Sequence, residues 1–440
     1  MEFIDRKREI KKLHEIDRLS CDVSQFTVIS GRRRIGKTLL VQEAYKDTPF
    51  LYFFVARKTE QELCRSFVES LQANISFPIV GKVSKFAEIF TLVMEIAKTQ
   101  HLILMIDEFQ EFYHVNPAIY SEMQDIWDRN HKEAHINLIV CGSVNSLLNK
   151  IFRDKKEPLY GRQTDQMRIR PFQPSVLKEI MERYNPQYKK EDLLALYLFT
   201  GGVAKYVELF VDKNKLTQSK MLDFVLERDS FFLTEGYAVL IEEFGKEYGT
   251  YFTIMSLIAQ GHNMRSEIED MLQMEISGYL KKLIDDYELV QKHQPLFETA
   301  PNKNVHYSLR DPFLRFWFRF IFKYNYILEA GGHEKLKELV KRDYSTYSGL
   351  ILEDYFRQVF IESGNYTRIG YWHDRKGNNE IDLIAADELS QTVDICEVKR
   401  QEKAIDLSIL RAKADVFLNT TKCYKTFHIN YRGLSMDDMV

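Results

Sequence analysis

The stretch that decides the fold is Gly31–Thr38, GRRRIGKT. It matches the pattern G-x-x-x-x-G-K-[ST], in which a glycine-bearing loop surrounds phosphate groups. An apolar run at 25–30, QFTVIS, precedes it, and a helical pattern at 37–45, KTLLVQEAY, follows it. A strand, this loop and a helix in that order are the context that a phosphate loop requires. The sequence therefore predicts that residues 31–39 bind the phosphates of a nucleotide.

The residues of this loop have separate expected roles. Backbone N–H groups of the loop and of the helix start face the phosphates. Lys37 neutralises charge on the outer phosphates, and the Thr38 hydroxyl binds Mg²⁺. The predicted cofactor-binding residues are Gly31, Arg32, Arg33, Arg34, Ile35, Gly36, Lys37, Thr38 and Leu39.

Apolar runs at 49–56, PFLYFFVA, and 101–107, HLILMID, predict a second and a third strand. The third strand delivers Asp107 and Glu108 at its carboxyl end. Ligands bind at the carboxyl ends of strands in open parallel sheets. Asp107 suits the Mg²⁺ shell, and Glu108 suits a base that orients the attacking water. The alternative is a strand that ends on ordinary surface acids, and the neighbouring phosphate loop favours the catalytic interpretation.

Two further positions near the predicted phosphates have two interpretations each. Ser143 or Asn145, at the end of the next apolar strand, could sense the γ-phosphate, or the Gly-Ser turn there could simply cap a helix. Arg162, in the loop PLYGRQ, could act as an arginine finger on a neighbour's phosphate. It could equally form a surface or intramolecular salt bridge.

Composition excludes several classes of protein. The chain has 440 residues, of which 45% are hydrophobic and 28% charged, which indicates a globular protein of two to four domains. The net charge of −3 excludes a generally basic nucleic-acid coat. The five cysteines form no C-x-x-C pair, which predicts reduced thiols in a cytoplasmic protein without structural zinc. The N-terminus does not read as a signal peptide, and the apolar run 313–322 is too short for a membrane span and carries Arg315 and Arg319.

The order of the motifs resembles the archaeal-type ATPase family, which contains P-loop ATPases of the AAA+/STAND kind. The segments that carry the resemblance are FIDRKREIKKL, GRRRIGKT, LMIDEF, VCGS and LYGR. The resemblance covers roughly residues 1–235. It implies ATP as the nucleotide, a P-loop αβα core over residues 1–172 and a helical lid over 173–240.

Two more segments take their interpretation from this resemblance. It places Phe3, Ile4 and Arg6 near the adenine, although the same residues could be a helix N-terminus with core contacts. The family's lid motif, Gly-Gly-x-Pro, is matched by Gly201 and Gly202 only. Ala204 replaces the proline and Lys205 follows it, which weakens any nucleotide-sensing role of the motif.

Residues 241–310 contain three helical patterns and then a probable hairpin, the order of a winged helix-turn-helix. The candidate recognition helix, ISGYLKKLIDDYELV, is net acidic and therefore pairs poorly with phosphates. This favours a structural or protein-contact role over DNA reading. An apolar helical connector is expected over 311–344.

Residues 345–440 predict a helix, three strands, a helix and a final strand. In ICEVK, the strand period of two places Glu397 and Lys399 on one face. Asp382 on the preceding strand, followed by Glu-x-Lys, resembles the PD-(D/E)xK restriction-endonuclease-like superfamily. The resemblance implies a nuclease with Asp382, Glu397 and Lys399 as catalytic residues. Its Mg²⁺ or Mn²⁺ ligands would be Asp382, Glu397 and Glu353, the last supplied by the helix before the strands.

The predicted fold class is therefore an α/β multidomain chain: a P-loop αβα core, a helical lid, a winged helix and a restriction-endonuclease-like domain. The predicted function is an ATP-hydrolysing ATPase coupled to a metal-dependent nuclease-like domain that acts on DNA. The alternative is an ATP-switched signalling or scaffold protein whose nuclease-fold domain binds without cutting. Either function is compatible with a protein partner or a homo-oligomer, and neither needs a membrane.

Overall fold

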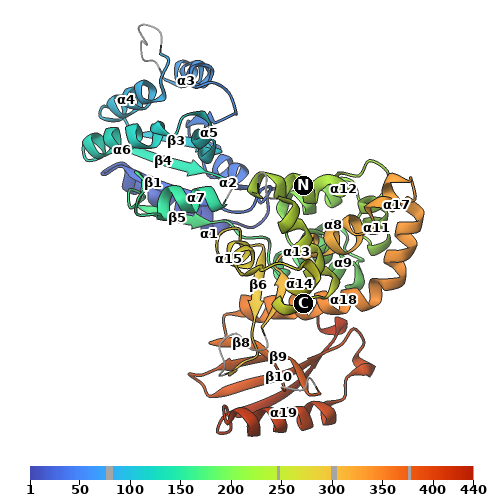
Figure 1. The fold of residues 1–440 in the computed structure, drawn as a ribbon. Helices are drawn as coiled ribbons and strands as arrows, with labels where there is room; N and C mark the ends of the chain where they lie inside the picture. Colours follow the sequence, from blue (N-terminus) through green and yellow to red (C-terminus); the bar gives the residue numbers. More distant parts are fainter. Residues whose placement is uncertain (76–82, 144, 245–247, 299–304, 375–377, 440) are drawn as a thin grey trace. The chain divides into compact units, whose positions relative to one another are not determined.

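The computed structural model describes residues 1–440 apart from 76–82, 144, 245–247, 299–304, 375–377 and 440, and it leaves the side chains of 145 and 242 undescribed (Figure 1). The chain divides into two compact units. The first is Glu2–Arg170, and the second is Pro171–Val440 together with Met1.

The unit Glu2–Arg170 is built on a parallel sheet with the strand order β2-β3-β4-β1-β5. Its strands are β1 (Gln25–Ser30), β2 (Leu51–Phe54), β3 (Leu102–Asp107), β4 (Ile136–Cys141) and β5 (Asp165–Arg168). Every residue of β3 and β4 is buried, as expected for parallel strands covered on both faces. The sequence predicted the first four strands and missed β5, whose residues DQMR are polar and accessible apart from the buried Met167.

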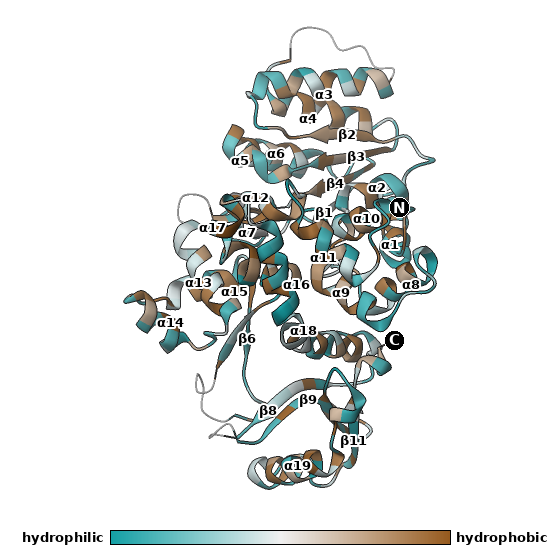
Figure 2. Cartoon of the chain, turned by 90° about the vertical axis from the view of Figure 1, so that its right-hand side faces the viewer, coloured by the Kyte–Doolittle hydropathy of each residue, from teal (hydrophilic) through white to brown (hydrophobic). Residues whose placement is uncertain are grey.

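Helices surround this sheet, and the strands are visibly more apolar than the helix surfaces (Figure 2). They are α1 (Lys7–Ser20), α2 (Lys37–Ala44), α3 (Glu60–Asn74), α4 (Phe86–Ala97), α5 (Phe112–Val115), α6 (Ala118–Asn130) and α7 (Asn145–Arg153). Aromatic side chains fill the core: the Phe53 and Phe67 rings stack at 4.4 Å, and the Phe26 ring meets the Trp127 ring edge-on at 5.2 Å. Such pairs stabilise the core beyond the area that they bury.

The second unit begins with helices packed around α9. These are α8 (Pro174–Tyr184), α9 (Lys190–Thr200), α10 (Ala204–Asp212), α11 (Gln218–Leu226) and α12 (Phe231–Phe244). Residues 192–200 of α9 are all buried, because the helix is apolar all round and neighbours cover every face.

Three helices and a hairpin follow, in the order that the sequence predicted. They are α13 (Tyr248–Gln260), α14 (Arg265–Leu272), α15 (Ser277–Asp285), β6 (Val290–His293) and β7 (His306–Leu309). The expected connector consists of α16 (Pro312–Phe316), the π-helical turn η3 (Trp317–Phe322) and α17 (Asn325–Glu329). A single long helix, α18 (His333–Ser363), then runs across residue 345, where we expected a new domain to begin.

The last part of the chain is a four-stranded sheet with the order β11-β10-β9-β8. Its strands are β8 (Arg368–His373), β9 (Glu380–Asp387), β10 (Thr392–Val398) and β11 (His428–Leu434), and α19 (Leu407–Thr421) joins the last two. The β8–β9 and β9–β10 pairs are antiparallel, whereas β10–β11 is parallel. The predicted order of helix, three strands, helix and strand is present. Trp372, Ile384, Ile395 and Phe417 form part of the core between this sheet and α19.

Candidate functional site

The loop Gly31–Gly36 links the buried strand β1 to the first residue of α2. Gly31 has φ +150°, and a Cβ there would lie 2.6 Å from the carbonyl oxygen of Ile169. Gly36 has φ +94° at the N-terminal cap of α2. Both positions therefore need glycine, one for space and conformation and the other for conformation. The helix start carries no side-chain cap, which leaves its N–H groups for a ligand.

Lys37 is folded back over this loop. Its Nζ donates to the carbonyl oxygens of Gly31 at 2.9 Å and Arg32 at 3.2 Å. Burial lowers the pKa of Lys37, although Glu108 and Asp107 favour the charged form. The ammonium is thus held inside the loop by weak partners, where a phosphate would be a stronger one.

The structure brings Thr38, Asp107 and Glu108 together with Ser143. The Thr38 hydroxyl donates to Asp107 Oδ2 at 2.6 Å, and the Tyr52 hydroxyl donates to the same oxygen at 3.1 Å. Glu108 has φ +52°, an uncommon conformation for a residue other than glycine. Its Oε2 accepts from Ser143 Oγ at 2.9 Å. Tyr52 was not predicted, although its place on β2 beside β3 follows once the strand order is known.

The chemical types of the donor atoms at this site suit Mg²⁺. A hydroxyl and a carboxylate oxygen are the hard donors that Mg²⁺ prefers, and those of Thr38 and Asp107 are already adjacent. The alternative for Asp107, an ordinary surface acid, does not match its 5% exposure.

Other predicted residues lie elsewhere or have other partners. Arg162 pairs with Asp128 Oδ2 at 3.1 Å, which is the intramolecular alternative to an arginine finger. The side chain of Asn145 lies outside the described residues. Arg6 donates to the Arg170 carbonyl at 2.7 Å, and Ile4 is buried, which matches the core-contact alternative for this segment.

The structure also gives the exposure of the remaining predicted residues of the phosphate loop and the contacts of the lid motif. Arg32, Arg33 and Arg34 are partly exposed, Ile35 is buried and Leu39 is exposed, so side chains on the loop face both core and solvent. Phe3 is half-buried.

In the second unit, which contains the lid motif, Gly202 has φ +75° and its carbonyl accepts from the Phe172 N–H at 2.8 Å. Lys205 pairs with Glu208 at 2.6 Å on the same helix.

The predicted C-terminal residues converge at one end of the β9–β10 pair. Lys399 Nζ lies 3.4 Å from Asp382 Oδ2 and 3.5 Å from Glu397 Oε1. Asp382 Oδ2 also accepts from the Val398 N–H at 2.8 Å. The side chains of Asp382 and Glu397 are 11% and 8% exposed, so both acids are largely withdrawn from solvent. Lys413 on α19, which the sequence did not single out, lies 3.1 Å from Glu397.

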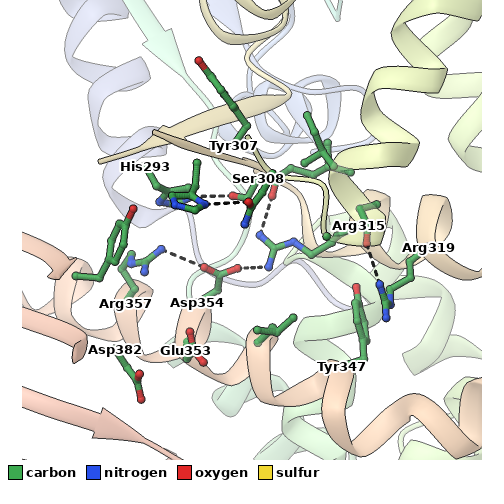
Figure 3. A pocket seen from close by; sticks show the side chains of 18 of the residues that line it. His293, Tyr307, Ser308, Arg315, Arg319, Tyr347, Glu353, Asp354, Arg357 and Asp382 are labelled. Atoms are coloured by element: carbon green, nitrogen blue, oxygen red, sulfur yellow. Dashed lines mark hydrogen bonds and ion pairs between the residues drawn. The ribbon is translucent and has the colours of Figure 1, made fainter. Parts of the chain in front are cut away.

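Glu353 faces the same place from α18. Burial, and then the charges of Asp382, Asp354 and Glu380, raise the pKa of Glu353 to about 8. The neighbouring Asp354 has a different role: Arg315 lies 2.5 Å from it and Arg357 3.3 Å. Burial alone would raise the pKa of Asp354, but these two guanidinium groups lower it. Glu353 and Asp382 both line a cavity, with Asp354 between the two arginines (Figure 3).

The carboxylate oxygens of Asp382 and Glu397 are the type of donor that a hard divalent cation prefers. One ammonium nitrogen reaches both Asp382 and Glu397, so one cation can lie within reach of both carboxylates. Among the described residues, no three or more His, Cys, Asp or Glu side chains are grouped as a ready metal cluster. Asp382 and Glu397 therefore form the core of the candidate centre, and Glu353 as a third ligand stays a prediction.

Family comparisons identify the domain that carries the phosphate loop. Residues 3–210 match a family described as an ATPase domain predominantly from Archaea. An uncharacterized protein of Methanocaldococcus jannaschii is 30% identical over 408 residues, which are 90% of this chain and 87% of the relative. The chain belongs to this archaeal-type ATPase family. Residues 317–412 match a second family, described as archaeal and bacterial proteins of unknown function.

Solved structures show the same fold for the ATPase. The Walker-type ATPase of Pyrococcus abyssi is similar with a TM-score of 0.55 and 18% identity, over 72% of this chain and 96% of that one. The ORC2 protein of Aeropyrum pernix has a TM-score of 0.50 and 16% identity, over 75% of this chain and 95% of its own. The predicted P-loop ATPase is thus confirmed as family and as fold. Within the described residues, no helix has the length and apolar character needed to cross a membrane.

Proposed function

We propose that the family's ATPase activity in this chain is coupled to a metal-dependent nuclease centre that acts on DNA. The observation that carries the nuclease part is the convergence of Lys399 on Asp382 and Glu397. We also propose the finer domain assignment: a P-loop core at 1–172, a lid at 173–240, a winged helix at 241–310, a connector at 311–344 and a restriction-endonuclease-like domain at 345–440.

In the ATP site, Lys37 would neutralise the outer phosphates together with the N–H groups of the loop 31–36. Thr38 and Asp107 would hold Mg²⁺, which when bound spreads the charge of the transferred phosphoryl group. Glu108 would orient the attacking water, and the hydrogen bond from Ser143 would fix its carboxylate.

In the nuclease centre, Asp382 and Glu397 would hold Mg²⁺ or Mn²⁺, with Glu353 as a third acid. The cation, when bound, would polarise the scissile phosphate. Lys399 would orient the attacking water or stabilise charge on the phosphate, because its ammonium already lies between the acids. The segment 276–290 carries Lys281 and Lys282 but also Asp285, Asp286 and Glu288. Because this segment is net acidic, we assign the winged helix a structural or protein-contact role.

The ATP assignment is tested by replacing Lys37. Lys37→Ala removes the ammonium inside the loop, and we expect ATP turnover to fall at least about a hundredfold. Lys46→Ala is the matched control, because Lys46 is exposed, lies just after α2 and pairs only locally with Glu43. Turnover that is equal in both variants would refute the assignment.

The nuclease assignment is tested by incubating plasmid and linear DNA with Mg²⁺ or Mn²⁺ and comparing Asp382→Ala with wild type. We expect the variant to lose cleavage, since it removes a carboxylate of the proposed metal pair. Asp415→Ala on the exposed side of α19 is the control and should cut normally. If wild type and Asp382→Ala give the same products, the nuclease assignment fails.

A second function remains a candidate because two lysines, Lys399 and Lys413, already pair with Glu397. In a scaffold protein, these pairs would stabilise a binding domain and need no metal. Failure of wild type to cut DNA under any metal condition, with ATP turnover intact, would favour this second function.

A further inference from the structure

A cavity of about 320 Å³ extends away from Glu353 and Asp382 within the second unit. Its walls come from the hairpin β6–β7, the helices α13, α16 and α18, the π-helical turn η3 and the strands β8 and β9. In Figure 3, Glu353 and Asp382 lie on one side and His293 and Ser308 on the other. The cavity therefore places a second wall opposite the proposed metal ligands.

A row of four rings, the ring wall, also lines the cavity: His293 and His306 come from the hairpin, and Tyr371 and His373 come from β8, the strand that pairs with β9. The His306 and His373 rings are 5.6 Å apart, those of His373 and Tyr371 are 5.9 Å apart, and those of Tyr371 and His293 are 6.2 Å apart. Burial, followed by the nearby Arg357, lowers the pKa of His293 to about 4, and burial with His373 lowers that of His306. Burial therefore favours the neutral form of both imidazoles, and the wall presents their ring faces to the cavity.

The hairpin is fixed to the strand that completes this wall. The Leu296 N–H donates to the Tyr371 carbonyl at 2.9 Å. A Cβ at Gly370 would lie 2.7 Å from the Leu296 side chain, so a larger residue there would force Leu296 to shift. The row of rings is thus held by main-chain contact and is a built surface.

Polar atoms without partners gather around the same cavity. Among the residues that the structure describes, five buried side-chain atoms of the cavity lining have no hydrogen-bond partner: Arg315 Nε, Arg319 Nε, Tyr347 Oη, Tyr371 Oη and His373 Nε2. Tyr347 is only 3% exposed. Buried polar groups are normally paired, and an unpaired one costs about 1–3 kcal/mol. A ligand with several donors and acceptors would provide the missing partners.

We propose that this cavity binds one unpaired nucleotide of a single-stranded nucleic acid, with its base against the ring wall and its phosphate toward Asp382. Base faces stack on aromatic rings whatever the sequence, and base edges supply the donors and acceptors that the cavity lacks. The volume suits one nucleotide and leaves no room for a base pair. Resting on the proposed nuclease function, this inference names the substrate as strand ends or single strands in preference to uninterrupted duplex.

The test measures how tightly the full chain binds a labelled single-stranded oligonucleotide and the blunt duplex of the same sequence, with Ca²⁺ present. Wild type should prefer the single strand. Tyr371→Ala should weaken single-strand binding about tenfold, as expected for one lost stacked base, and leave duplex binding unchanged. Tyr371→Phe keeps the ring and loses only the hydroxyl, so it should bind the single strand more tightly than Tyr371→Ala does, which separates the stacking contribution from that of the hydroxyl.

Two outcomes overturn the inference: wild type without preference for the single strand, or Tyr371→Ala with unchanged single-strand binding. Cleavage assays separate it from the proposed function. If Asp382→Ala abolishes cleavage while Tyr371→Ala binds normally, the cavity assignment fails and the nuclease stands. If wild type cuts nothing while Tyr371→Ala still loses single-strand binding, the nuclease fails and the cavity assignment stands.

Discussion

Asp394 on β10 shows how one buried residue makes stability depend on pH. It accepts hydrogen bonds from Tyr366 and Asn430, both at 2.8 Å, and from Arg432 at 2.9 Å. Burial alone would raise the pKa of Asp394, but these three donors hold it below its usual range. A lowered pKa in the folded state means that the carboxylate stabilises the fold above the unfolded-state pKa. This contribution is lost as pH falls through the folded-state value.

Asp394→Asn should therefore lower the free energy of unfolding at pH 7 by about 1–3 kcal/mol, because Arg432 loses a charged partner. Below about pH 4 the wild-type carboxylate is increasingly protonated in the unfolded state, so the difference should shrink. Urea unfolding of both proteins at pH 7 and pH 3 measures this. An equal difference at the two pH values would contradict the explanation.

Single residues also mark the limit of sequence reasoning. Lys37, Thr38 and Asp107 were predictable because the motif fixes their spacing and the parallel sheet brings strand ends together. Lys413 was not, because its contact with Glu397 depends on how α19 packs on the sheet. The presence of Arg357 beside the proposed metal centre could have been predicted, since it lies four residues after Glu353 and therefore on the same face of the helix.

At the scale of elements, the packing of α12 on η3 depends on one small residue. A Cβ at Gly236 would lie 2.2 Å from the Trp317 indole, which is fully buried. A Cβ added at Gly249 in α13 would meet no atom within 4 Å. The same substitution should therefore have opposite effects in these two helices.

Gly236→Ala should lower the free energy of unfolding by about 1–3 kcal/mol, because the indole must move within a closely packed core. Gly249→Ala should raise it by about 0.5–1 kcal/mol, because alanine loses less backbone entropy in a helix. Urea unfolding midpoints of the two variants compare them directly. A stability for Gly236→Ala at or above that of wild type would show that the indole can adapt.

Elements were predictable where hydrophobic periodicity was strong, and less so elsewhere. The buried runs of β1, β3 and β4 and the strands β9 and β10 follow from their apolar residues. The short strand β5 could not be predicted in this way. It is a strand because it pairs with β1, and its own composition does not indicate one. The continuous helix α18 was divided at residue 345 because domain resemblance, not helix periodicity, set that boundary.

At the scale of the whole molecule, the ATPase lies in the unit Glu2–Arg170 and the proposed nuclease centre lies in the other. An ATP-controlled nuclease therefore requires that nucleotide binding in one unit changes activity in the other. Such coupling is a difference in free energy between states, and it appears as a change in rate when ATP is added.

The most direct measurement is the rate of DNA cleavage in Mn²⁺ with and without ATP, for wild type and for Lys37→Ala. We expect ATP to change the wild-type rate severalfold and to leave the rate of Lys37→Ala unchanged, while Asp382→Ala cuts in neither condition. If ATP alters cleavage equally in wild type and Lys37→Ala, or leaves both unaffected, the claim of an ATP-controlled nuclease is contradicted.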